Sequence, residues 1–348
     1  MHILLIRFSS MGDVVLQTAT VNWLRSLYGK QLKVTFVTSK EFASLVEGHP
    51  GINFVLSFDR RKEKWNDFIK RLDSHTDLHP VDLILDTHAT LRSFRLKLSY
   101  WGTKQLTVDK RRWERFFLTK IKSVTVRRLF HGKIFGLESQ VERIITDLQT
   151  LFGDTRGVSE TRDYRRGPHQ EMTSLADLPV YPIAGKYIVL APSASFAPKR
   201  WGIQSFVELA RELLKETQLH VVVLAGPDDK FCEAFDVITD PRFLNLQGKT
   251  TLKESMQILA RAEASVGNDS GMNHIAEAYG VPVVTIFGPT SPLFGFVPHG
   301  KKSGYLSKDL WCKPCSTTGK SPCYRKEHIC MNEISVGEVK AMALKALA

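Results

Sequence analysis

The sequence lacks the glycine-rich turn, G-x-G-x-x-G, that follows the first strand of dinucleotide-binding domains. Where that turn would lie, the chain reads IRFSSMGDVV, with one glycine, Gly12, followed at once by Asp13. The chain also lacks any long apolar run, since segments such as YIVLAP are only strand-sized, and its N-terminus has no signal-peptide pattern. These absences argue against a dinucleotide site at the first strand and predict a cytoplasmic protein, which could still lie on a membrane surface.

Acidic residues are scarce in the first half of the chain. Residues 1–170 hold 29 Lys and Arg against 18 Asp and Glu, whereas residues 171–348 are almost balanced, and the whole chain has a net charge of +12. A basic domain attracts nucleic acid, anionic lipid or an acidic substrate without choosing among them. No helix-turn-helix, RRM or zinc-finger pattern is found, so we expect no nucleic-acid partner.

Short apolar segments alternate with helical patterns along most of the chain, which predicts parallel sheets covered on both faces. We expect an α/β fold of two Rossmann-like, doubly wound domains facing a central cleft. The predicted parts are an N-terminal domain (1–160), a linker (161–186), a C-terminal domain (187–334) and a last helix (335–348), which could pack back on the N-terminal domain. Ligands of such folds bind at the carboxyl ends of the strands.

The clearest ligand signal lies in residues 264–292, ASVGNDSGMNHIAEAYGVPVVTIFGPTSP. A strand leads to Asp269, Ser270 and Gly271, after which a helix begins with Met272 and His274 in its first turn. Backbone N–H groups at a helix N-terminus favour an anion such as a diphosphate. Asp269 and Ser270 could equally be ordinary helix caps.

Two further strand ends carry polar groups. In LAPSASFAPKRW, Ser193 and Ser195 precede Lys199 and Arg200, which could bind a phosphate or form an ordinary basic loop. In VVVLAGPDD, Asp228 and Asp229 could accept the hydroxyls of a ribose or cap the next helix.

These stretches, taken together and in order along the chain, resemble the ADP-heptose heptosyltransferases, which are glycosyltransferase family 9. The resemblance implies a GT-B fold, with the nucleotide sugar bound by the C-terminal domain and the acceptor by the N-terminal one. It also implies inverting transfer of heptose from ADP-heptose to Kdo or heptose of the lipopolysaccharide inner core. The expected donor-binding residues are Ser193, Ser195, Lys199, Arg200, Asp228, Asp269, Ser270, Gly271, Met272 and His274.

The sequence has no D-x-D pair with which a GT-A enzyme would bind a metal ion. The charge that develops on the departing ADP must then be stabilised by fixed donors, Lys199 above all, so we expect no cofactor in catalysis. The resemblance makes Asp13 the base that accepts the acceptor's proton. A helix N-terminus weakens a carboxylate as a base, and Asp13 could instead be the N-cap of a helix over residues 14–28.

The acceptor of this family is an anionic glycolipid at the cytoplasmic face of the inner membrane, which suits the basic N-terminal domain. Trp and Phe interleaved with Arg in DRRKEKW and DKRRWERF also fit a loop on that surface. The candidate acceptor-binding residues are Ser10, Gly12, Arg60, Arg61, Lys64, His88, Arg92, Arg111, Arg112 and Arg115. A core or surface role is open for each of them.

Four of the five cysteines crowd near the end of the chain, as C-x2-C-x7-C-x6-C. Cys312, Cys315, Cys323 and Cys330 could hold a structural zinc or iron ion, since disulfides are rare in the cytoplasm. Two other functions share much of the pattern: a glycosyltransferase with another donor or a protein acceptor, and a sugar-nucleotide epimerase of GT-B fold.

Overall fold

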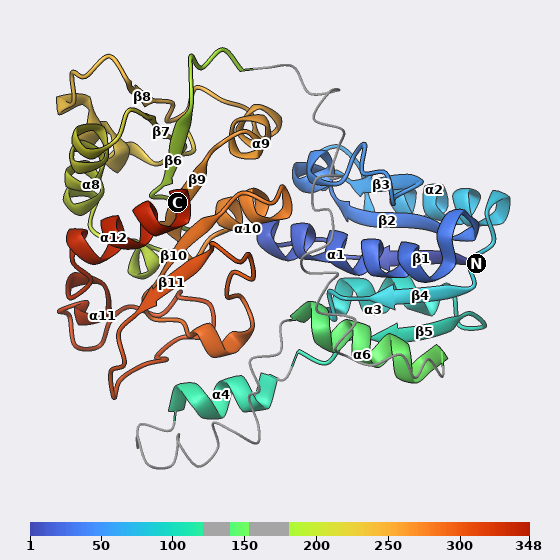
Figure 1. Cartoon of the computed structure of the whole chain (residues 1–348). Coiled ribbons are helices and arrows are strands. Elements are labelled where there is room, and N and C mark those ends of the chain that lie inside the picture. The colour runs from blue at the N-terminus through green and yellow to red at the C-terminus, as the bar shows by residue number, and fades with distance from the viewer. Residues whose placement is uncertain (111, 121–139, 153–180) are drawn as a thin grey trace. The chain divides into compact units, whose positions relative to one another are not determined.

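The computed structural model describes residues 1–110, 112–120, 140–152 and 181–348 (Figure 1). The chain divides into two compact units. The first contains residues 1–110 and 140–178, and the second contains residues 111–139 and 179–348. Each unit is built on one parallel sheet, as the alternation of apolar and helical segments predicts. Among the described helices, none combines the length and apolar character needed to cross a bilayer.

The sheet of the first unit has the strand order β3-β2-β1-β4-β5, and every pairing is parallel. Its strands are β1 (His2–Ile6), β2 (Lys33–Ser39), β3 (Phe54–Phe58), β4 (Leu83–Asp86) and β5 (Lys104–Thr107). The central strand β1 is buried along its whole length, because side chains on both of its faces are covered. This explains why its sequence is uniformly apolar rather than alternating.

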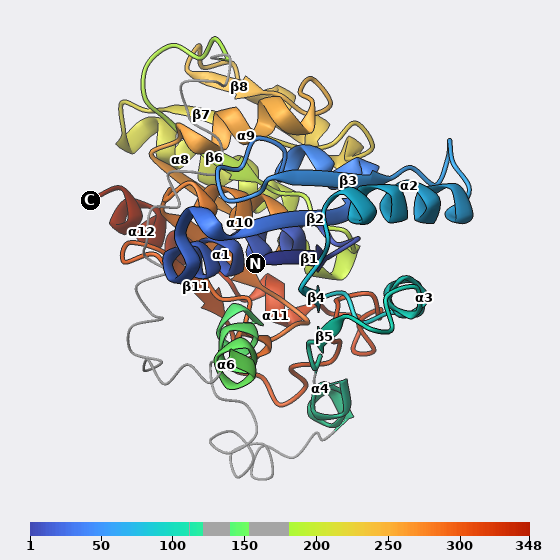
Figure 2. The same ribbon diagram turned by 90° about the vertical axis from the view of Figure 1, so that its right-hand side faces the viewer.

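The described helices of the first unit are α1 (Met11–Tyr28), α2 (Trp65–Leu78), α3 (Leu91–Leu98) and α6 (Gln140–Phe152). α6 packs against α1. On one side of the sheet, Phe8, Phe68 and Leu96 form a core with the side chains of β1 and β4. Figure 2 shows α3 at the outer rim of this unit.

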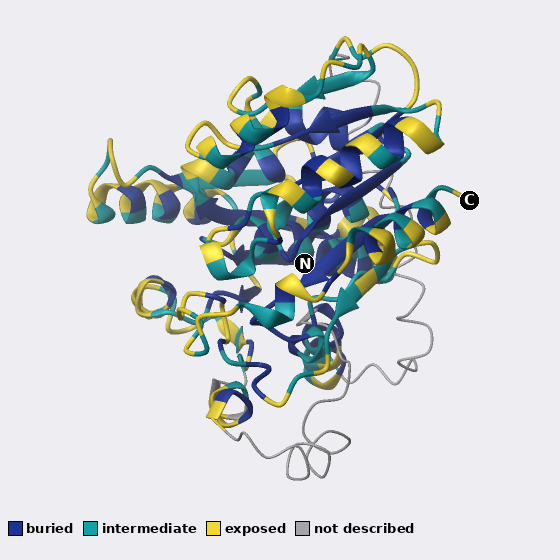
Figure 3. Cartoon of the chain, turned by 90° about the vertical axis from the view of Figure 1, so that its left-hand side faces the viewer, coloured by how far each residue is buried: buried dark blue, intermediate teal, exposed yellow. Residues whose placement is uncertain are grey.

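The sheet of the second unit has the order β11-β10-β9-β6-β7-β8, again with parallel pairings. Its strands are β6 (Tyr187–Ala191), β7 (His220–Val223), β8 (Phe243–Asn245), β9 (Ala264–Asn268), β10 (Val283–Phe287) and β11 (Gly304–Ser307). Its helices are α4 (Arg112–Lys120), α8 (Ile203–Glu216), α9 (Leu252–Ala260), α10 (Gly271–Ala278), α11 (Ile329–Asn332) and α12 (Val336–Leu347). The central strands are buried throughout (Figure 3).

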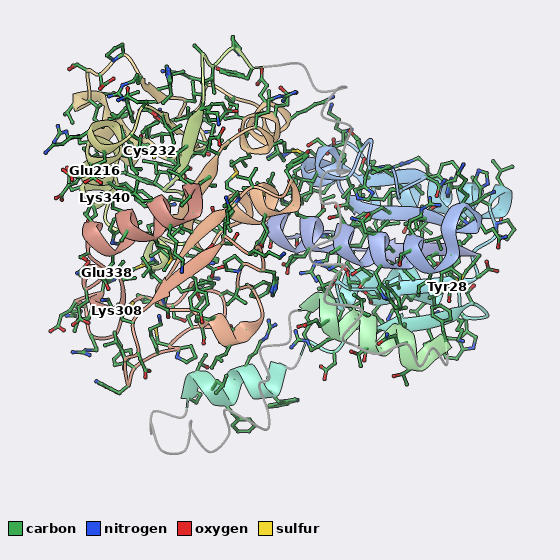
Figure 4. All side chains as sticks on the ribbon, viewed as in Figure 1. Tyr28, Glu216, Cys232, Lys308, Glu338 and Lys340 are labelled. Carbon is green, nitrogen blue, oxygen red and sulfur yellow. The ribbon has the colours of Figure 1, made fainter. Side chains whose placement is uncertain are left out.

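The last helix, α12, packs within the second unit and not on the N-terminal domain, which the sequence had left possible. Val339, Ala343 and Ala346 are buried in the core that α8 and the central strands share. Lys340 forms ion pairs with Glu212 and Glu216 of α8, and Lys308 pairs with Glu338 at 2.7 Å (Figure 4). The apolar side chains of α12 thus complete the core of the domain that immediately precedes it.

The position of α4 also differs from the prediction, because this helix groups with the second unit although it lies within the predicted N-terminal domain (1–160). Leu118 of α4 is buried against Phe294 and Phe296. Arg115 lies over both of these rings and donates a hydrogen bond to the Phe294 carbonyl at 3.3 Å. The chain therefore contributes α4 to the second unit before it forms α6, which belongs to the first unit.

Candidate functional site

Asp13 lies at the third position of α1, near the carboxyl end of β1. The helix begins at Met11 and its N-cap is Ser10, so Asp13 is not the N-cap that the sequence allowed. The Ser10 hydroxyl and backbone N–H both donate to Asp13 Oδ2, at 2.9 and 3.2 Å. Arg7, which directly follows β1, places Nη2 2.5 Å from the same oxygen. Asp13 thus takes part in a capping box and a largely buried ion pair.

Burial of the Asp13 carboxyl favours its neutral form, but the charge of Arg7 and the Ser10 hydrogen bonds outweigh it. Together they lower the pKa of Asp13 below its ordinary value of 3.8. Asp13 is therefore ionised at neutral pH and is a weak base. The side chain keeps 17% of its exposure, so it is not sealed inside the core.

We expect the substitution Arg7→Gln to raise the pKa of Asp13, because the burial that favours the neutral carboxyl then acts without the guanidinium charge. If the reaction needs Asp13 ionised, kcat is lost as pH falls through this pKa, so the acid limb moves to higher pH. The measurement is kcat against pH for both proteins, with Arg71→Gln, which removes a surface ion pair with Glu63, as the control. Coincident acid limbs would contradict the role of Arg7.

A pocket of about 590 Å³ lies in the first unit, and it combines aromatic and cationic side chains. Its lining residues are Phe58, Arg60, Trp65, His88, Thr90, Leu91, Arg92 and Arg95. The Arg92 guanidinium lies 5.6 Å from the ring centres of Phe8 and Phe58. Burial, with the nearby charges of Arg7 and Lys110, lowers the pKa of His88 to about 4, so its ring is neutral at pH 7.

The pocket brings together three of the predicted acceptor residues, Arg60, His88 and Arg92. Arg61 and Lys64 are not among its lining residues, while Ser10 and Gly12 lie at the start of α1. Arg111 and the side chain of Arg112 lie outside the described residues. Arg115 lies on α4, which groups with the second unit.

Sequence reasoning missed two contributors in the first unit. Phe58 reads as a strand residue, yet it supplies a wall of the pocket. Arg7 reads as the end of an apolar strand, and only its ion pair with Asp13 reveals its importance. A signal was available for Arg7, since a charged residue directly after a buried strand is costly unless it has a partner.

In the second unit, Lys199 and Asp269 form an ion pair of 2.8 Å between two neighbouring strand ends. Lys199 follows β6 and Asp269 follows β9, and the register of these parallel strands places their carboxyl ends together. The Thr290 hydroxyl donates to the same Asp269 oxygen at 2.9 Å. Asp269 is thus a positioning group for the Lys199 ammonium, which is 15% exposed.

After β7, the polar contacts are made by Asp229 and not by Asp228. Asp229 Oδ2 accepts hydrogen bonds from the Ser193 hydroxyl at 2.6 Å and from the Gly226 N–H at 2.9 Å. Arg200 lies 3.5 Å from the other Asp229 oxygen and 4.5 Å from the centre of the Phe231 ring. Asp228 is exposed, as is Ser195. The sequence could not separate the adjacent acids, because both follow the same strand.

The turn before α10 places Ser270 as N-cap and Gly271 as the first helical residue. The Ser270 hydroxyl makes no cap hydrogen bond, and this buried oxygen has no hydrogen-bond partner among the described residues. Met272 lies in the first turn of α10, and the His274 ring lies 6.1 Å from that of Phe296. A buried hydroxyl beside a helix N-terminus is suited to bind an anion.

Gly319, in the cysteine-rich loop, lies against the stem of Lys199. A Cβ atom at this position would collide with Cγ and Cδ of Lys199, and the residue has a φ of +83°, which favours glycine. The loop therefore confines the aliphatic part of the lysine from one side, while Asp269 binds its ammonium.

We expect Gly319→Ala to lower any activity that depends on Lys199 by roughly tenfold, because small displacements of a positioned group are costly. The measurement is kcat with saturating substrates. Gly102→Ala is a matched control, since a Cβ there meets nothing within 4 Å and no left-handed φ is required. Equal activities of the two variants would contradict the positioning of Lys199 by the loop.

The four late cysteines are all free thiols in this structure. Within the described residues, which include all four, no group of three or more Cys, His, Asp or Glu side chains could hold a metal ion. Burial, with the nearby Cys315, Cys312 and Cys323 thiols, raises the pKa of Cys330 to about 11. Buried Lys313 donates hydrogen bonds to the Phe287 carbonyl and the Ser307 hydroxyl. The described residues thus show no zinc or iron site at these cysteines.

Two parallel-sheet α/β domains, with polar groups at the strand ends of each, define a protein of the GT-B fold class. The E. coli heptosyltransferase WaaC with ADP has this fold with a TM-score of 0.67, at 18% identity, and the match covers 99% of this chain and 100% of WaaC. A family model described as glycosyltransferase family 9 (heptosyltransferase) matches residues 135–324, more than half of the chain. The chain belongs to this family.

Curated relatives carry heptosyltransferase names of more than one kind. The chain is 30% identical over 161 residues to a lipooligosaccharide heptosyltransferase 2 of Campylobacter jejuni, a match that covers 44% of this chain and 49% of that relative. It is 26% identical over 331 residues to lipopolysaccharide heptosyltransferase 1 of Pseudomonas aeruginosa, covering 90% of this chain and 86% of the relative. The chain thus spans about half the length of the first of these relatives and most of the second.

Proposed function

We propose that the protein is an inverting, metal-independent glycosyltransferase that moves L-glycero-D-manno-heptose from ADP-heptose to a lipopolysaccharide inner-core sugar, Kdo or heptose. The observation that supports this proposal best is the Lys199–Asp269–Thr290 arrangement, which places a cation beside a helix N-terminus in a heptosyltransferase-family domain. The heptosyltransferase names of the relatives and the ADP in the WaaC title support the choice of donor.

In the proposed reaction, the second unit binds the nucleotide and stabilises its departure. The Lys199 ammonium and the N–H groups at the start of α10 offset the negative charge that develops on the diphosphate. Ser270 offers a buried hydroxyl to the same anion. Asp229 would accept hydrogen bonds from the ribose hydroxyls. It also holds the Ser193 and Arg200 side chains in place. Fixed donors of this kind supply the charge stabilisation that a metal ion would otherwise give.

The first unit is proposed to bind the acceptor and to accept its proton. The acceptor hydroxyl attacks the anomeric carbon as the bond to the diphosphate breaks, and Asp13 takes the hydroxyl proton. A weak base suffices if that proton leaves late, when the new bond has already made the hydroxyl acidic. Arg60, Arg92 and Arg95 would pair with the carboxylates and phosphates of the acceptor, and the rings of Phe58 and Trp65 offer faces for its sugars.

Transfer to a lipid-linked acceptor would take place at the cytoplasmic face of the inner membrane, with the protein bound peripherally. The excess of basic residues in the first half of the chain supports this proposal, because that face carries anionic lipids.

Nucleotide release from ADP-heptose, measured with and without Kdo–lipid A, tests the proposed function. UDP- and GDP-sugars serve as comparison donors, and EDTA tests metal independence. We expect acceptor-dependent release of ADP alone, unaffected by EDTA. Release from another nucleotide sugar would indicate a different donor, and turnover without any acceptor would indicate an epimerase. No turnover of ADP-heptose with any core acceptor would contradict the proposal.

A further inference from the structure

The outer face of α3 is apolar and exposed, which is unusual for a helix that packs on a sheet. Leu91, Phe94 and Leu98 are 67%, 53% and 50% exposed, and Trp101, just beyond the helix, is 84% exposed. Leu91, Phe94 and Leu98 are spaced by three and four residues, which places them along one side of the helix. We call these four residues the α3 stripe. The α3 helix, seen nearly end-on at the left of Figure 3, is mostly drawn as exposed.

The stripe is not the side of α3 that packs into the protein core. The opposite side of α3 is already seated, because Leu96 is fully buried in the core with Phe8 and Phe68, and Ser93 is buried as well. Tyr100 anchors the end of the segment through a 2.8 Å hydrogen bond to Asp73 of α2. The helix is therefore attached through one face and offers a second apolar face to solvent.

Basic side chains predominate beside the stripe, although Asp73 and Asp77 of α2 lie near Tyr100. Residues 87–108 contain four Lys and Arg and no Asp or Glu. Arg92 and Arg95 are exposed beside the stripe, and Lys104 is exposed on the strand that follows, whereas Lys97 pairs with Asp86. An apolar row bordered by cations suits the surface of an anionic bilayer, because the apolar side chains can enter the interface while the cations bind the lipid headgroups. Two copies of this face would instead bring their Arg92 and Arg95 side chains together, which opposes a dimer.

The stripe also begins at the wall of the aromatic and cationic pocket. Leu91 is a member of both, and the neighbouring residues Arg92 and Arg95 line the pocket. A ligand with a sugar end and a lipid end could place its sugars in the pocket while its acyl chains remain in the bilayer under α3. We propose that the α3 stripe is the surface by which this protein docks on anionic membranes. This inference deepens the proposed function and rests on it for the identity of the ligand.

The test is sedimentation of the full-length protein with sucrose-loaded vesicles that contain no acceptor. The vesicles are phosphatidylcholine alone or an equal mixture of phosphatidylcholine and phosphatidylglycerol. We expect binding to the anionic vesicles only, weakened by salt, and a decrease of roughly tenfold in the partition coefficient for the double variant Phe94→Ser/Leu98→Ser, since two apolar side chains no longer enter the interface. Leu78→Ser, at the exposed last position of α2, is the control and should bind as the wild type does.

Several results would overturn the proposal. These are unchanged sedimentation of the double variant, an equal loss in the Leu78→Ser control, or loss of binding only when Trp113 and Phe116 of α4, which are also exposed, are replaced. A concentration-dependent dimer of the wild type that the double variant abolishes would identify a second copy as the occupant. Unchanged thermal unfolding would show that the variant is folded, as expected for exposed positions.

Activity measurements separate this inference from the proposed function. With a soluble acceptor that has no acyl chains, the double variant should transfer heptose as fast as the wild type, while transfer to a vesicle-embedded acceptor should fall. If the wild type transfers to neither acceptor, the proposed function has failed, and the sedimentation result still decides whether α3 docks on membranes.

Discussion

Replacing Asp13 by Asn is expected to lower kcat for heptosyl transfer by about 10³-fold, within the range that general bases contribute. The amide has nearly the shape of the carboxylate but cannot accept the proton. The dissociation constant for ADP-heptose should change little, because Asp13 lies in the first unit and the residues proposed to bind the donor lie in the second. The measurements are single-turnover transfer and donor binding by calorimetry.

The ion pair with Arg7 complicates this experiment, and a second variant resolves it. The substitution Asp13→Asn would leave the largely buried Arg7 charge without its carboxylate, which costs about 3–5 kcal/mol in comparable buried pairs. The double variant Arg7→Gln/Asp13→Asn removes both charges and should regain most of the lost stability. If Asp13 is the base, the double variant remains inactive. Activity that returns together with stability would show that Asp13 only holds the start of α1 in place.

Replacing Lys199 by Met is expected to lower kcat by about 10²–10³-fold, the usual loss when one fixed donor to a developing anion is removed. The Lys199 ammonium lies 2.8 Å from Asp269, which directly precedes the N-cap of α10, and Asp269 would be left as an anion where the diphosphate is proposed to bind. The KM for the donor should rise as well. The measurement is a full kcat and KM determination, with Lys320→Met, an exposed lysine of the neighbouring loop, as the control.

The variant Lys199→Met/Asp269→Asn distinguishes a role in the reaction from a role in folding. It removes the ion pair completely, so a merely structural lysine would make this variant nearly as active as the wild type. A lysine that stabilises the departing diphosphate cannot be replaced in this way. The double variant should then remain as slow as Lys199→Met, although it unfolds at a similar temperature to the wild type.

The regular elements could largely be predicted, because buried strands and helices have recognisable apolar sequence patterns. β6, β10, α8 and α12 follow the alternation that the sequence shows, since each is a continuous apolar run or a strongly periodic segment. The edge strands β8 and β11 could not be predicted. Their residues are only partly buried, so their sequences lack the continuous apolar pattern of a central strand.

The candidate site could be predicted only as far as the sheet edge at which its residues lie. Lys199 and Asp269 each follow a strand of one parallel sheet, so both could be assigned to its carboxyl edge, whereas the pairing of β6 with β9, which are not consecutive in the chain, required the structure. The contact between Gly319 and Lys199 depends on the path of a loop, and loop paths do not follow from periodicity. The unit to which α4 belongs could not be predicted either. Its assignment depends on the packing of Leu118 against Phe294, which lies far later in the sequence.

The passage of the chain through residues 111–139 affects how the protein can be divided and synthesised. A fragment that begins after the predicted linker, at residue 187, would lack α4 and leave Phe294 without the side chain of Leu118. During synthesis, α4 leaves the ribosome long before Phe294 and Phe296, against which it packs, and α6, which packs against α1, follows α4 in the chain. The two units are therefore not independent modules of a linear chain, and exchanging domains between relatives would require two cut points rather than one.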